Sequence, residues 1–268
     1  MAFGQRQLSR RYRGCPVGAQ LMPVEVKSLS VYFDFLNSTL SVPSTRTWFR
    51  GHSDLRWSLT PSALRYSTRA EREKALSLLD EFRRICDIRI ERPPGSEQRL
   101  EWMQLAQHYG LPTRLLDWTV NAAIALFFAC QYHQGTDGMV FVLDPIELNE
   151  NGDSGLSGIV DPQVDARLVD PYLKLHAAET RRGRPTIAIN PILNSQRIML
   201  QRGTFTLHGS RRFGLDRSQA PSLKYLPILR NYKGILCAQL GKIGVDEMSI
   251  FPEPEHVSVH LKRTANLL

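Results

Sequence analysis

The pentapeptide WFRGH, Trp48–His52, joins residue types that bind phosphate and ribose. An arginine offers a planar fork of N–H donors that matches the oxygens of a phosphate group. The glycine beside it allows a positive φ or the close approach of a ligand, and a histidine can contact a ribose or act as a base. Arg50, Gly51 and His52 are therefore candidate nucleotide-binding residues. The alternative is that Arg50 pairs with a buried carboxylate such as Asp117.

A second polar group lies in HYGLPTRLLDWT, residues 108–119. Arg114 stands between two apolar stretches, so we expect it either to be paired or to face a ligand, because an unpaired buried guanidinium is costly. Asp117 precedes an apolar helical stretch and can cap that helix through a side-chain oxygen. We interpret Arg114 and Asp117 as candidate ligand contacts, with helix capping as the alternative for Asp117.

Two later motifs add hydroxyls and a carboxylate. In GTFTL, Thr204 and Thr206 would share one face of a strand. Such a pair can form the floor of a nucleotide pocket or an ordinary exposed β face. In GVDEMSI, Glu247 can reach a ribose hydroxyl or help to cap a turn.

Other chemistry receives less support from the sequence. His52, His108 and Asp117 would allow phosphodiester cleavage without a metal. The chain lacks a P-loop and the GxGxxG, HExxH and GxSxG motifs. Its four cysteines show no CxxC spacing, which predicts no metal site and thiols in a reducing compartment.

These residues need elements to position them. The apolar spacing predicts helices over 24–40 with Ser28 or Ser30 as N-cap, 70–90, 96–110 with Ser96 as N-cap and Gly110 as its stop, 119–135, and 232–244. Short apolar or alternating runs predict strands at 47–51, 138–144, 186–189, 223–229 and 255–262, with two further runs on either side of a turn at 202–203.

The fold class is therefore α+β, with a helical N-terminal half packed on a mixed or antiparallel sheet formed by the Arg50 strand and the C-terminal half. We expect a basic flexible arm over 1–22 and one domain over 23–268, with a loop insertion at about 145–185.

Charge and hydropathy limit the partners. The 268 residues carry a net charge of +8, with arginines clustered at 6–13, 181–184 and 211–212. This favours a phosphate-bearing partner, either a nucleotide or nucleic acid, although a solvated basic face is the alternative. The longest apolar run, Ala122–Cys130, is too short to span a bilayer. We expect a soluble cytoplasmic protein with no membrane partner.

Four blocks taken together resemble the FRG domain family, which is named after an aromatic-Arg-Gly triplet. The blocks are WFRGH, the series Trp57, Leu59, Pro61 and Arg65, the stretch Gln107–Ala129, and the stretch Gln196–Phe205. The resemblance extends over roughly 48–262. It implies a context similar to that of toxins and anti-phage defence proteins.

The aromatic-Arg-Gly triplet at the end of a first strand is also similar to the opening motif of arginine-type ADP-ribosyltransferases. This resemblance implies an ADP-ribosyltransferase-like fold and NAD as cofactor, with Arg50 on the pyrophosphate and His52 at a ribose. Thr204 and Thr206 would line the pocket, and Glu247 would stabilise the oxocarbenium-like transition state. Asp117 is the alternative carboxylate, since Val245 stands where that superfamily carries Glu or Gln, two residues before Glu247.

Three functions follow as hypotheses. The first is an NAD-dependent ADP-ribosyltransferase-like toxin or defence effector that modifies a protein or nucleic-acid target. The second is a non-catalytic module that binds a nucleotide or nucleic acid. The third is a metal-independent nuclease.

Overall fold

The computed structural model describes residues 24–40, 47–151, 156–174, 183–210, 214–265 and 267. The predicted arm over 1–22 lies outside these residues, as do parts of the stretch 145–185 and most of the arginines in the three clusters. Within the described ranges, no helix is long and apolar enough to cross a membrane.

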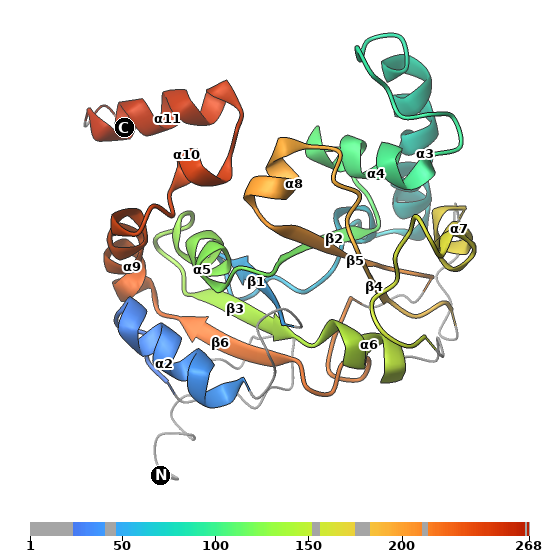
Figure 1. The fold of residues 1–268 in the computed structure, drawn as a ribbon. Coiled ribbons are helices and arrows are strands. Elements are labelled where there is room, and N and C mark those ends of the chain that lie inside the picture. Colours follow the sequence, from blue (N-terminus) through green and yellow to red (C-terminus); the bar gives the residue numbers. More distant parts are fainter. Residues whose placement is uncertain are drawn as a thin grey trace.

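A six-stranded sheet organises the chain, in the order β4-β5-β2-β1-β3-β6 (Figure 1). Every neighbouring pair is antiparallel. The α+β class with an antiparallel sheet is thus confirmed. The strands are β1 Trp48–His52, β2 Leu115–Thr119, β3 Gly138–Leu143, β4 Ile187–Ile189, β5 Gly203–Leu207 and β6 Lys224–Ile228.

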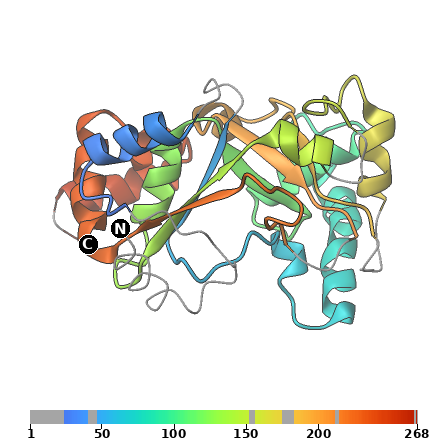
Figure 2. The same cartoon turned by 90° about the horizontal axis from the view of Figure 1, so that it is seen from below.

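The helices form two groups over one face of the sheet, and these groups lie on the left and on the right in Figures 1 and 2. The first group packs over β1, β3 and β6 and contains α2 Leu29–Thr39, α5 Ala122–Cys130, α9 Arg230–Lys242 and α10 Glu247–Ile250. The second packs over β2, β4 and β5 and contains α3 Arg69–Cys86, α4 Arg99–His108, α7 Ala166–Leu173 and α8 Gln196–Leu200. The C-terminal helix α11, Pro254–Thr264, follows α10.

The opposite face of the sheet is covered by loops and by helix α6, Pro145–Asn151. Its core is formed by alternate strand residues such as Trp48, Phe141 and Tyr225, which are all buried. Side chains that alternate along a strand point to opposite faces. Trp48, Arg50 and His52 therefore lie on this face of β1, whereas Phe49 and Gly51 face the helices.

Several local expectations are confirmed by the helix ends. The Ser28 side chain accepts a hydrogen bond from the Val31 amide and caps α2. Gly110, with φ of +83°, follows the end of α4, and Gly244, with φ of +77°, follows α9. A left-handed residue at this position is favoured when it is glycine.

Two expected caps are wrong. Asn121, and not Asp117, caps α5, because its side chain accepts from the amides of Ala123 and Ile124. Asp117 lies inside strand β2. Ser96 does not cap α4, whose N-cap is Gln98.

Three expected elements also differ. The stretch 255–262 belongs to helix α11, since a short alternating run with Pro254 at its start fits either period. The apolar run before the turn at 202–203 is helix α8, which is capped by Ser195. The stretch 145–185 carries helices α6 and α7 within its described part.

Candidate functional site

Strands β1 and β2 separate soon after they meet, and this gap defines the site. They pair only through Phe49 and Thr119, although β1 pairs with β3 along its whole length. The Asp117 carbonyl group faces the gap, and Arg50 Nη1 donates to its oxygen at 2.5 Å. A side chain thus replaces the backbone donor that a continued ladder would supply.

His52 holds this guanidinium from the other side. Its Nε2 accepts from Arg50 Nε at 2.8 Å, and its Nδ1 donates to the Trp57 carbonyl oxygen at 3.2 Å. A carbonyl only accepts and a guanidinium only donates, which assigns this neutral tautomer. Burial, and then the charge of Arg50, lowers the pKa of His52 well below its usual value. Both ring nitrogens are engaged, so His52 positions Arg50.

The Asp117 carboxylate forms only a long ion pair with Arg50. Its Oδ2 lies 3.7 Å from Arg50 Nη1, and its side chain is 57% exposed. Gln107 Nε2 donates to its Oδ1 at 2.6 Å, and Gln107 in turn accepts from the Thr113 hydroxyl. Arg50 therefore meets both the backbone and the carboxylate of Asp117, but the carboxylate remains open to solvent.

Two cavities meet at Arg50, Gly51 and Phe128. The first cavity, of about 220 Å³, lies between the two helix groups and is lined by β1, β2, α4, α8, the start of β5 and Phe128 of α5. The second cavity, of about 500 Å³, extends from His52 along the loop 53–58 to Arg65, Tyr132 and His133. Arg50 contributes to the walls of both.

Residues 45–138 match the family model of the FRG domain. This stretch is an FRG domain. It contains β1, β2, α3, α4 and α5, and with them Arg50, His52 and Asp117. Comparisons with curated proteins and with solved structures found no match to the chain. All the residues that line the second cavity belong to the FRG domain, as do part of those that line the first, whereas α8 and β5 lie beyond the matched residues.

Gly51 of the FRG domain serves the packing of β1 on α5. A Cβ atom at this position would collide with the backbone carbonyl oxygen of Ala125. Its φ is not in the left-handed region. The glycine is therefore explained by close contact between a strand and a helix, and it lines both cavities as a consequence.

The two threonines of β5 have separate surroundings. Thr204 lines the first cavity and donates to the Ile189 carbonyl oxygen at 3.2 Å. Thr206 lines neither cavity: its hydroxyl accepts from Trp118 Nε1 at 3.0 Å and contacts His208 Nε2 at 3.2 Å. The predicted shared face exists, but it belongs mostly to the core.

Arg114 lies outside both cavities. It is buried, and its Nη1 donates to the Gly209 carbonyl oxygen at 2.5 Å. Burial, followed by the charges of Arg114 and Arg50, lowers the pKa of nearby His208 to about 3. The sequence left open whether Arg114 is paired or faces a ligand. In the structure it is paired with a backbone carbonyl group.

Glu247 is also engaged away from the cavities. Its Oε1 lies 2.9 Å from His256 Nδ1, and its Oε2 accepts from Gln131 Nε2 at 3.3 Å. The carboxylate is buried and lines neither cavity. In this arrangement it ties α10 to α11 and to the end of α5.

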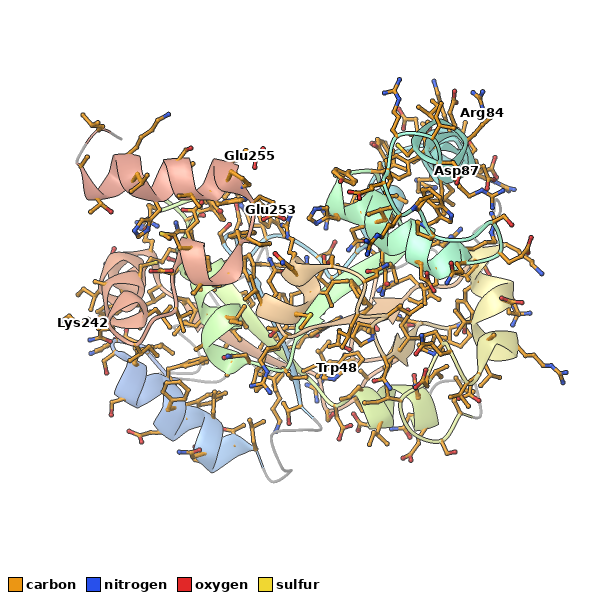
Figure 3. The ribbon with its side chains drawn as sticks, turned by 45° about the horizontal axis from the view of Figure 1, so that its top comes forward. Trp48, Arg84, Asp87, Lys242, Glu253 and Glu255 are labelled. Atoms are coloured by element: carbon orange, nitrogen blue, oxygen red, sulfur yellow. The ribbon has the colours of Figure 1, made fainter. Side chains whose placement is uncertain are left out.

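A second carboxylate, to which no sequence motif pointed, lies beside the first cavity. Glu253 Oε1 is 3.6 Å from His108 Nε2 and 3.7 Å from Arg197 Nη1, and both His108 and Arg197 line the cavity. Burial, and then the charge of Arg197, lowers the pKa of His108. Arg197 also lies over the ring of Phe251, 4.9 Å from its centroid. Figure 3 labels Glu253 where the C-terminal segment approaches α4 and α8.

A metal has no evident place in the described ranges, where no three His, Cys, Asp or Glu side chains gather to hold one. The chemistry that the arrangement can perform is recognition of an anion by Arg50, with aromatic walls on either side.

Proposed function

We propose that the FRG domain binds a nucleotide through Arg50, and that NAD is this ligand. The observation that carries the proposal is the position of one oriented guanidinium at the junction of two cavities. The larger cavity has a volume within the roughly 300–1,000 Å³ range of small-molecule sites.

The hydrogen bonds of Arg50 within the chain do not use all of its N–H donors. A guanidinium carries five N–H groups. Arg50 uses one on His52 and one on the Asp117 carbonyl. Nη1 also lies 3.7 Å from the Asp117 carboxylate, whereas Nη2 makes no hydrogen bond within the described part of the chain, so a phosphate oxygen could accept from it.

The state of charge supports the same function. The Arg50 side chain is only 17% exposed. Burial lowers the pKa of Arg50 to about 10, although Asp117 opposes the shift. The guanidinium thus stays charged at neutral pH while it is poorly solvated. Binding a phosphate anion would offset this loss of hydration.

The first cavity also offers aromatic side chains to the rings of a nucleotide. Phe49, Trp118, Phe128 and Phe205 line the first cavity. Aromatic side chains provide large apolar area for a base or a pyridine ring. Together with the resemblance to ADP-ribosyltransferases, this favours NAD over a simple phosphate.

The second candidate function is turnover of NAD. The protein would then be an effector of the toxin or defence class. Turnover is favoured by one observation, that the Asp117 carboxylate lines the first cavity beside Arg50. Asp117 is a better-placed carboxylate than Glu247, which is held by His256 and Gln131. A nuclease receives less support, because His52 and His108 line different cavities.

The test is titration of the purified protein with NAD and ADP-ribose by calorimetry. Arg50→Ala should abolish binding, and Arg50→Lys should weaken it at least 10-fold because the fork of donors is lost. Arg84→Ala, on the exposed far end of α3, is the matched control (Figure 3). Unchanged affinity in Arg50→Ala would disprove the proposal. Release of nicotinamide that Asp117→Asn removes, with binding retained, would establish turnover.

A further inference from the structure

The second cavity has an exposed tryptophan in its wall. Trp48, Trp102 and Trp118 are all buried, but Trp57 is 45% exposed. Its ring lies edge-on to His133, with centroids 5.1 Å apart, and edge-on to His52 at 6.0 Å. These neighbours fix the indole while its remaining surface faces the cavity, beside the half-exposed Tyr132.

The positive charge of this cavity is only partly compensated. Arg56 is neutralised by buried Asp54, through a two-pronged contact from Nε and Nη2. Arg65 and Arg50 both interact with one carboxylate, that of Asp117. The charge of Arg65 also contributes to the lowered pKa of Arg50. Two guanidinium groups against one acid leave a position that favours an anion.

A buried ammonium group holds the wall of the cavity in place. Lys233 of α9 is fully buried, and its Nζ donates to the carbonyl oxygens of Ser53 at 2.7 Å, His133 at 3.1 Å and Tyr132 at 3.2 Å. These carbonyls belong to two separate loops that line the cavity. The site is therefore preorganised before any ligand binds, which lowers the entropic cost of binding.

We propose that the second cavity binds a nucleotide unit of its own, with the phosphate on Arg50 and Arg65 and the base against Trp57. This inference rests on the proposed function, since the first cavity would take the other half of the ligand. The ligand class is then a dinucleotide joined by a pyrophosphate, whose two phosphates lie at Arg50, where the cavities meet.

The experiment compares a dinucleotide with its halves by calorimetry, using NAD, AMP and nicotinamide mononucleotide. We expect the wild-type protein to bind NAD at least 10-fold more tightly than either mononucleotide. Trp57→Ala should weaken NAD binding about 10-fold, because a base stacked on an aromatic ring loses its platform. Trp57→Phe should retain most of the affinity, and Arg65→Gln should weaken NAD binding several-fold.

Phe33→Ala on α2 is the control, since Phe33 is an exposed aromatic that lines neither cavity. Thermal melts of each variant would confirm folding. Equal NAD affinity in Trp57→Ala and wild type would overturn the inference, as would a mononucleotide that binds as tightly as NAD. Both results leave the role of Arg50 intact, whereas a wild-type protein that binds none of the three would overturn both proposals. A short RNA that binds through Trp57 while NAD does not would overturn the dinucleotide assignment.

Discussion

Arg50 makes its hydrogen bonds within its own chain, to the ring of His52 and to the backbone of Asp117. The sequence left open whether this arginine pairs with Asp117 or binds a ligand. The two roles are compatible, because these two contacts use Nε and Nη1 of the guanidinium. At the scale of single residues, His52 and Asp117 orient the donors, and the donors that remain face the cavities.

Gly51 gives a stability prediction at this scale. Gly51→Ala should lower the free energy of unfolding by about 1–3 kcal/mol, because its Cβ would press on the α5 backbone at Ala125. Gly234→Ala, within α9 where a Cβ meets nothing, should instead raise it by about 0.5–1 kcal/mol. Urea unfolding measures both. Equal stability of Gly51→Ala and the wild type would show that β1 need not lie so close to α5.

At the scale of elements, the FRG domain does not enclose the first cavity alone. Helix α8 and the start of β5 form its other wall, and the segment between α10 and α11 brings Glu253 to His108 and Arg197. Within the described ranges, neither oxygen of Glu253 has a hydrogen-bond partner. This partly buried acid, 3.7 Å from Arg197, would compete with an incoming anion for the Arg197 guanidinium.

Removing this acid should therefore help an anionic ligand. Glu253→Gln is expected to tighten NAD binding about 2–5-fold, the size of a partly exposed ion pair. Glu255→Gln, two residues further on and exposed, is the matched control and should change nothing (Figure 3). Calorimetry at constant salt measures the change. Weaker binding in Glu253→Gln would mean that the acid holds Arg197 in position.

At the scale of the whole molecule, buried neutral histidines make the fold sensitive to acid. His52 lies on β1, and His208 follows β5. The pKa of His52 is well below its usual value, and that of His208 is about 3, chiefly because of burial. The unfolded chain binds protons at these groups below about pH 6.5, where the folded chain does not.

Stability should thus be constant above about pH 7 and fall as the pH drops from about 6.5 towards 3. Each buried histidine contributes about 1.4 kcal/mol per pH unit within this window. Urea unfolding at pH 7.5, 6.0 and 5.0 measures the slope. His208→Gln should reduce the slope, since one titrating group is gone and the amide can still bond Thr206 or Thr186. A flat profile between pH 7.5 and 5.0 would contradict this prediction.

The sequence alone predicted the α+β class, the resemblance to the FRG domain, and elements such as β1, α5 and α9. The resemblance was expected over roughly 48–262, whereas the family model matches 45–138. It also pointed to Arg50, His52 and Asp117. These features are local: apolar spacing, a capping residue or a short motif reports on neighbours within a few turns of one element. The expected helix cap at Asp117 failed because Asn121 competes for the same helix end.

Only the tertiary structure decided what surrounds Arg50. The gap between β1 and β2 brings together residues 67 positions apart, and the contact of Glu253 with His108 joins the C-terminal segment to α4. Distant elements also decide that Glu247 and Thr206 lie outside the cavities and that Trp57 is exposed. Such choices follow from strand register and helix packing across the whole chain, so no local pattern could have predicted them.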